Sequence, residues 1–133
     1  MSFDPHRNYP LGSERPDLVT TPGGLRLDEL TLHGAGVQAS ELRATPRTLR
    51  FQAEVAGAAG RCQLADNLRR AAELAPLPDE TILEIYTALR PRRSSAGELE
   101  TWAGRLEALG APLNAEFVRD ALRVYATRGL LAP

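Results

Sequence analysis

Apolar residues recur with helical spacing along the chain from about residue 45 onward. Residues three, four and seven positions apart lie on the same face of an α-helix, so this spacing predicts helices that each turn one face inward. Five helices are expected. The apolar residues that define them are Leu49, Ala53 and Ala56; Leu64, Leu68, Ala71, Ala72 and Ala75; Ile82, Ile85, Tyr86 and Leu89; Leu99, Trp102, Ala103 and Leu106; and Phe117, Val118, Ala121, Val124 and Tyr125.

Polar residues predict where these helices begin. Thr45 followed by Pro46 is typical of a helix N-terminus, where threonine caps the helix and the N–H that proline lacks is not needed. Ser95 and Glu98 fit a capping box, and Asn114 is expected to cap the last helix. The expected helices run from about 46 to 59, from Gln63 to Ala75, from Asp79 to Arg90, from the Ser95 cap to Gly110, and from Asn114 to Gly129.

The helix expected at 46–59 is apolar on two sides. Leu49 and Ala53 lie on one face, whereas Phe51 and Val55 lie on another. A surface helix normally keeps a polar side, so a helix without one is either central in its domain or shared with a partner.

The first 40 residues carry turn signals rather than a helical pattern. Proline restrains its own φ and biases the preceding residue away from the helix, so no long element is expected there. We expect residues 1–40 to form an irregular N-terminal arm or subdomain and residues 41–133 to form a helical domain. The expected fold class is all-α, with a compact bundle of about five short helices after the arm. The turn signals are Asp4-Pro5, Tyr9-Pro10, Arg15-Pro16 and Pro22-Gly23-Gly24.

Composition narrows the class of protein. Of the 133 residues, 43% are hydrophobic and 25% are charged, which is typical of a globular protein. The formal net charge of −1 argues against a domain whose whole surface binds nucleic acid or anionic lipid. Cys62 is the single cysteine, which favours a reducing compartment. No signal sequence or long apolar run is evident, so we expect a soluble, cytoplasmic protein.

Residues that could bind a metal or act in catalysis are few and scattered. His6, His33 and Cys62 are the nitrogen and sulfur candidates, and their spacing does not resemble that of a metal site. The stretch "TPGGLRLDE" at 21–29 lacks the lysine of a phosphate-binding loop, and we interpret it as a turn. Capping already accounts for Ser95. No catalytic, cofactor-binding or metal-binding residues are therefore predicted.

The most unusual feature is the arginine corner, residues 90–93, where Arg90, Arg92 and Arg93 surround Pro91. Arg69-Arg70 forms a second basic pair upstream. Arg90 could interact with the last carbonyls of its own helix, and the other arginines could be merely solvated. Alternatively, their planar guanidinium groups could bind carboxylates on another chain. A small helical module that binds nucleic acid or acts as an adaptor is a further alternative.

Three stretches closely resemble a known family. They are "NLRRAAEL" (67–74), "PDETILEIYTALRPRRSS" (78–95) and "NAEFVRDA" (114–121). They resemble the small, or gamma, subunit of adenosylcobalamin-dependent diol and glycerol dehydratases. The stretch "AGRCQLADN" (59–67) is more similar to the propanediol than to the glycerol dehydratase members. The resemblance extends collinearly from Tyr9 to Leu131.

The resemblance implies a division of labour between subunits. In the family, the large subunit is a TIM barrel that holds the substrate, and adenosylcobalamin lies between the large and medium subunits. The small subunit packs on the large one in a dimer of heterotrimers. The holoenzyme, a lyase, converts a 1,2-diol or glycerol to an aldehyde and water by radical chemistry. The resemblance thus implies a non-catalytic subunit with large and medium subunits as partners, and without nucleic acid or membrane.

The resemblance also points to particular residues within the matched stretches. We expect Asn67, Tyr86, Arg90, Pro91 and Arg93 to support either the corner or the contact with a partner subunit. Tyr86 has an alternative role as a core residue on its helix stripe. The sequence does not identify the preferred diol, and packaging within a bacterial microcompartment stays open.

Overall fold

The computed structural model describes residues 2–30 and 37–133. Residues 1 and 31–36, which include His33, lie outside the described residues. The described chain is helical and contains no β-strand beyond one isolated bridge between Thr20 and Arg26. The all-α prediction is therefore confirmed.

The chain forms two compact units, Met1–Pro76 and Leu77–Pro133. The division expected at residue 40 marks a change from irregular to helical local structure, whereas the two units are defined by packing. The expected division therefore stays a prediction.

The N-terminal part of unit 1 is built from short turns, as its prolines predict. It contains one α-helical turn and three 3-10 turns, which are α1 (Leu11–Glu14), η1 (Pro16–Leu18), η2 (Leu27–Glu29) and η3 (Ala39–Leu42). The "TPGGLRLDE" stretch forms a turn: the Thr21 N–H donates to the Leu25 carbonyl at 2.9 Å. The Glu41 carboxylate closes this turn by accepting hydrogen bonds from the Thr21 hydroxyl and the Gly23 N–H.

Two helices of 13 residues each complete unit 1, namely α2 (Pro46–Ala58) and α3 (Cys62–Leu74). The Thr45 hydroxyl caps α2 by accepting from the Thr48 N–H at 3.2 Å, as predicted. Gly60, with φ of 77°, ends α2 in the left-handed conformation that glycine adopts without steric cost. The Arg61 N–H then donates to the Ala56 carbonyl at 2.9 Å, and this bond turns the chain back into α3.

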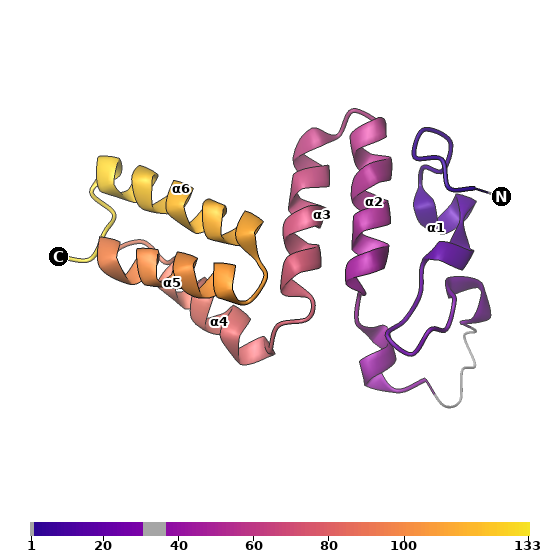
Figure 1. Cartoon of the computed structure of the whole chain (residues 1–133), viewed down its shortest axis with the longest axis horizontal. Coiled ribbons are helices and arrows are strands. Elements are labelled where there is room, and N and C mark those ends of the chain that lie inside the picture. Colours follow the sequence, from indigo (N-terminus) through magenta and orange to yellow (C-terminus); the bar gives the residue numbers. More distant parts are fainter. Residues whose placement is uncertain (1, 31–36) are drawn as a thin grey trace. The chain divides into compact units, whose positions relative to one another are not determined.

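Helix α2 is the centre of unit 1, lying between α3 and the N-terminal segment (Figure 1). Small buried residues, Ala53 on α2 and Ala65 on α3, let the two helices approach closely. On its other side, the Phe51 ring contacts Phe3 edge to face, with centroids 4.8 Å apart. The Thr48 hydroxyl lies 3.2 Å from the Thr20 N–H, which donates to it. The two apolar sides of α2 are thus both covered within unit 1.

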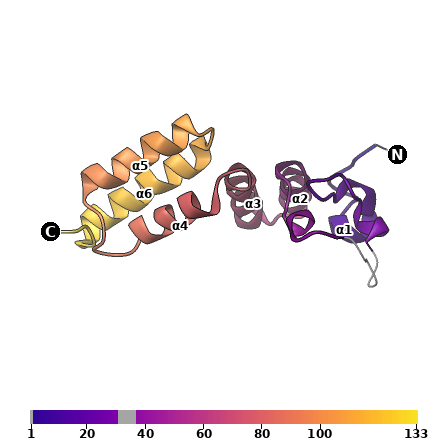
Figure 2. The ribbon, with the colours of Figure 1, turned by 90° about the horizontal axis from the view of Figure 1, so that it is seen from below.

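Unit 2 consists of three helices, α4 (Asp79–Ala88), α5 (Ala96–Ala108) and α6 (Pro112–Arg128), which Figure 2 shows grouped together. Their buried faces form one apolar core, and burial of such side chains is the main source of its stability. The largest fully buried side chains of this core are Leu99, Leu106 and Val118. Residues from all three helices contribute to it: Ile85, Ala88, Leu99, Ala103, Leu106, Ala115 and Val118.

An ion-pair cluster joins α5 to α6 on the surface of unit 2. The Arg119 guanidinium of α6 donates to the Glu100 carboxylate at 2.9 Å and to the Glu107 carboxylate at 2.5 Å. The hydrogen bonds that Arg119 donates to Glu107 hold the pKa of the Glu107 carboxyl below its ordinary value, and the positive charge of Arg119 adds to this effect. The cluster thus bridges α5 and α6 at the surface of unit 2.

All five long helices begin and end within two residues of the predicted positions. The capping box of α5 is confirmed: Ser95 Oγ accepts from the Glu98 N–H, and the Glu98 carboxylate accepts from the Ser95 N–H. The cap predicted at Asn114 is wrong. Helix α6 begins at Pro112, so Asn114 is a buried residue of its first turn. Proline's restrained φ suits the first helical position, and it starts the helix earlier.

Candidate functional site

The arginine corner is a tight turn between α4 and α5. Helix α4 ends at Ala88, two residues before Arg90. The Arg90 N–H then donates to the Thr87 carbonyl, and the Arg93 N–H donates to the Arg90 carbonyl, both at 3.1 Å. Arg92 has a φ of 61°, a left-handed conformation that is sterically unfavourable for any residue except glycine. The fold therefore holds an arginine where glycine would be less strained.

Residues of α6 and of the C-terminal segment hold this corner in place. The Tyr125 hydroxyl donates to the Leu89 carbonyl at 2.6 Å. The Arg92 N–H donates to the Leu130 carbonyl at 2.7 Å, and the Ala132 N–H donates to the Ser94 carbonyl at 2.9 Å. The backbone of the corner is therefore fixed by contacts with segments more than 30 residues away in sequence.

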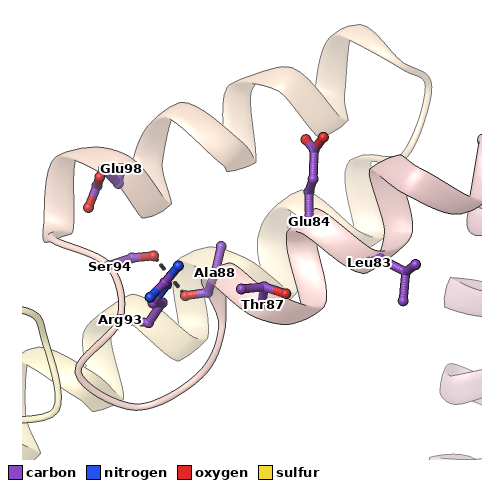
Figure 3. Close-up of a pocket in the computed structure, with 7 residues that line it drawn as sticks. All are labelled: Leu83, Glu84, Thr87, Ala88, Arg93, Ser94 and Glu98. Atoms are coloured by element: carbon purple, nitrogen blue, oxygen red, sulfur yellow. Dashed lines mark hydrogen bonds between the residues drawn. The ribbon is translucent and has the colours of Figure 1, made fainter.

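Ser94 makes the corresponding contact at the end of α4. Its hydroxyl donates to the Ala88 carbonyl at 2.8 Å, as Figure 3 shows, and the side chain is buried. Together with Tyr125, it satisfies two carbonyls that the end of α4 would otherwise leave without partners. The local role considered for Arg90 was to cap these carbonyls. The structure assigns that role to Ser94 and Tyr125 instead.

The side chains of the corner point outward and are exposed. Arg90, Arg92 and Arg93 form no ion pair with any residue in the described part of the chain. Of these three arginines, Arg93 affects the pKa of a nearby carboxylate, that of Glu98. Hydrogen bonds from Ser95 hold the pKa of Glu98 below its ordinary value, and the positive charge of Arg93 adds to this effect.

A groove of about 350 Å³ opens beside the corner, between α4 and the start of α5. Figure 3 shows the side chains around it: Leu83, Glu84, Thr87, Ala88, Arg93, Ser94 and Glu98. Its lining combines aliphatic carbon, one guanidinium group and two carboxylates. No three of the groove residues are of the types that bind a metal, and the groove is open to solvent on one side.

The outer face of α4 continues the corner as an apolar surface. Tyr86 is 71% exposed and Leu83 is 65% exposed. The alternative role of Tyr86 as a core residue is therefore wrong. Helix α4 is apolar on two sides, and the core takes the side of Ile85, so Tyr86 faces solvent. Leu83 was not among the predicted residues, because its position lies off the stripe that periodicity selected.

The structure brings together four of the five residues expected to support docking. Tyr86, Arg90, Pro91 and Arg93 lie along the outer face of α4 and the adjoining corner, and all are exposed. Asn67 lies on α3 in unit 1, where its side-chain oxygen accepts a hydrogen bond from Arg70. The assignment of these residues to a subunit contact stays a prediction.

The residues that could bind a metal ion do not cluster in the described part of the chain. No group of three or more His, Cys, Asp and Glu side chains lies close enough together to hold a metal ion in residues 2–30 and 37–133. Cys62 is an exposed free thiol at the start of α3. None of the helices in the described ranges has both the length and the apolar character needed to cross a bilayer.

The comparisons with known proteins show the class to which this chain belongs. Residues 5–132 match the model of the dehydratase small-subunit family, so the chain belongs to that family. It is 47% identical over 125 residues to the propanediol dehydratase small subunit of Citrobacter freundii, covering 91% of this chain and 73% of that protein. It is 46% identical over 125 residues to the propanediol dehydratase small subunit of Salmonella typhimurium strain LT2, covering 91% of this chain and 72% of that protein. The family resemblance found in the sequence is thereby confirmed.

Proposed function

We propose that this chain is the non-catalytic small subunit of a coenzyme B12-dependent diol dehydratase. The observation that carries the proposal is its similarity, over 91% of its length, to two small subunits of propanediol dehydratase. The complete enzyme would convert a 1,2-diol or glycerol to an aldehyde and water. Its partners would be the large and medium subunits, in a dimer of heterotrimers, and its location would be the cytoplasm or a microcompartment within it.

Adenosylcobalamin would be bound by the other subunits, where it supplies the radical chemistry of the reaction. His6, the histidine among the described residues, is exposed in the N-terminal segment. In this proposal the chain takes no direct part in the reaction.

The role that the residues of this chain support is binding to another subunit. An exposed tyrosine and leucine lie beside three arginines that have no carboxylate within ion-pair distance among the described residues. Protein interfaces are enriched in aromatic residues and arginine and depleted in lysine.

Reconstitution tests this proposal. The tagged chain is co-expressed with the large and medium subunits of the dehydratase, purified by its tag, and assayed for aldehyde from 1,2-propanediol with added adenosylcobalamin. We expect all three chains to copurify, and activity to require the cofactor and this chain. The control is the same preparation made without this chain. If the two other subunits assemble and turn over diol equally well without it, the chain is an accessory or adaptor, and the proposal is wrong.

A further inference from the structure

The structure assigns a docking surface to unit 2, which we define as the outer face of α4 (Leu83 and Tyr86) together with the arginine corner. We propose that this docking surface binds an apolar patch rimmed by carboxylates on another subunit of the dehydratase. The inference rests on the proposed function, because it takes the partner to be a dehydratase subunit. It adds where the contact lies and what chemistry the partner must present.

The apolar half of the docking surface is not used by the core of unit 2. Helix α4 packs into unit 2 through Thr81, Ile85 and Ala88, which are spaced by four and three residues and are all buried. Leu83 and Tyr86 point to the other side and are more than half exposed. Single exposed apolar residues are ordinary, but two large ones side by side next to a charged rim are typical of an interaction site.

The charged half of the docking surface is distinguished by arginines that form no ion pair in the described chain, whereas other arginines of unit 2 do. Three of its seven arginines have a carboxylate partner: Arg105 pairs with Glu84, Arg119 with Glu100 and Glu107, and Arg123 with Asp120. The other four form no ion pair in the described part of the chain, and they are Arg90, Arg92, Arg93 and Arg128.

These four arginines lie at one end of unit 2. Arg128 is the last residue of α6 and comes two residues before Leu130, whose carbonyl accepts the Arg92 N–H. The carboxylates of Glu98 and Glu84 line the same groove as Arg93. Positive charge exceeds negative charge at this end of unit 2. Carboxylates on a partner would therefore be attracted to it and would pair with the arginines.

The rigid corner makes this surface suited to specific binding. Its backbone is held by Tyr125, Leu130 and Ala132, so little backbone freedom would be lost on association. Guanidinium groups bind carboxylates through two parallel hydrogen bonds, which fixes the orientation of the partner. A left-handed arginine at the centre of the turn is consistent with a side chain retained for contact rather than for local stability.

A protein fits this surface better than a nucleic acid does. Leu83 and Tyr86 extend the basic residues with an apolar surface that a phosphate backbone would not cover. The arginines are confined to one end of the unit, and the whole chain has a net charge of −1. The partner is therefore inferred to be a protein surface with carboxylates around an apolar centre.

Charge reversal with a matched control tests the inference. The double variant Arg90→Glu/Arg93→Glu is compared with Arg7→Glu/Arg50→Glu, which makes the same change of charge at two exposed arginines of unit 1 that form no ion pair in the described chain. Binding of each full-length chain to the co-expressed large and medium subunits is measured at about 50 mM and about 500 mM salt. We expect the corner variant to bind at least about tenfold more weakly at low salt, and the control variant to stay within about threefold of the wild type.

A second pair of variants tests the apolar half. Leu83→Ala/Tyr86→Ser should weaken the complex by about tenfold or more while leaving the melting temperature of the chain unchanged, because both side chains are exposed. The control is Leu109→Ala, which removes another exposed leucine of unit 2. It should leave binding unchanged.

The outcomes separate the inference from the proposed function. If the wild-type chain does not bind the other subunits, the proposed function is wrong and the inference is wrong with it. If the wild type binds and the variants bind equally well, only the inference is overturned. A loss of binding matched by a fall in melting temperature indicates a structural role and also overturns it. The inference is also overturned if the wild-type chain binds a single-stranded oligonucleotide, and the corner variant loses this binding but still forms the subunit complex.

Discussion

The Tyr125 hydroxyl donates a hydrogen bond to the Leu89 carbonyl at a distance of 2.6 Å, although the two residues are 36 positions apart. This bond joins the C-terminal part of α6 to the end of α4. It satisfies a carbonyl at the helix end and sets the position of the arginine corner that follows. One phenolic oxygen thus connects the packing of unit 2 to the surface that we propose for docking.

Replacing Tyr125 by phenylalanine should lower the free energy of unfolding by about 1 kcal/mol, because the Leu89 carbonyl loses its donor while the ring stays. Urea denaturation of the full chain measures this. The matched control is Tyr86→Phe, since the Tyr86 hydroxyl is exposed and has no hydrogen-bond partner in the described chain. That control should leave stability unchanged. Equal losses in both variants would show that the bond to Leu89 contributes nothing.

Replacing Arg92 by glycine should make the isolated chain between about 0 and about 1.5 kcal/mol more stable than the wild type. The left-handed conformation costs an L residue about 1–2 kcal/mol, and glycine avoids this cost while losing about 0.5–1 kcal/mol through the unfolded state. The control Arg93→Gly lacks this gain, because Arg93 does not have a positive φ, and it should be destabilised by about 0.5–1 kcal/mol. Thermal melting compares the two. Destabilisation of Arg92→Gly as large as that of Arg93→Gly would contradict the prediction.

Acid should weaken unit 2 through Glu107. Arg119 holds the pKa of the Glu107 carboxyl below its ordinary value of 4.5, so the folded chain binds this proton less readily than the unfolded chain. The contribution to stability is therefore present above about pH 4.5 and is lost as the pH falls through the lower, folded pKa. We expect the melting temperature of Glu107→Gln to fall less steeply than that of the wild type between about pH 5 and about pH 3.

The control for the acid prediction is Glu116→Gln, which removes an exposed carboxylate without an ion pair in the described chain. Its melting temperature should follow the wild-type pH profile. The Glu107 prediction fails if the wild type and Glu107→Gln have parallel profiles over this range. Because the ion pair is exposed to solvent, added salt should also reduce the difference between them.

Local signals in the sequence predicted most helix ends. Thr45 and the Ser95–Glu98 box were recognisable because a capping side chain bonds to a backbone group only three residues away. Gly110 was recognisable because glycine adopts the left-handed turn at a helix end, where its φ is 79°. The start of α6 was misjudged because Asn114 and Pro112 are both good starting signals, and the sequence does not rank them.

The candidate site could be predicted in part. The arginines were evident from their clustering, and four of the five expected residues lie together on α4 and the corner. Tyr86 was also considered for the core because α4 is apolar on two sides, and periodicity does not say which side is buried. Leu83 was missed for the same reason. Both questions are decided by the helices that pack against α4.

The sequence by itself determined the all-α class, the approximate helix bounds and the dehydratase small-subunit family, because these depend on local hydrogen bonding, on apolar periodicity and on collinear residue matches. Only the tertiary structure decided which apolar face of α4 is buried and which arginines have carboxylate partners. It also showed that Tyr125 and Ser94, rather than Arg90, satisfy the carbonyls at the end of α4. Those features depend on contacts between residues far apart in the chain, which a one-dimensional pattern does not encode.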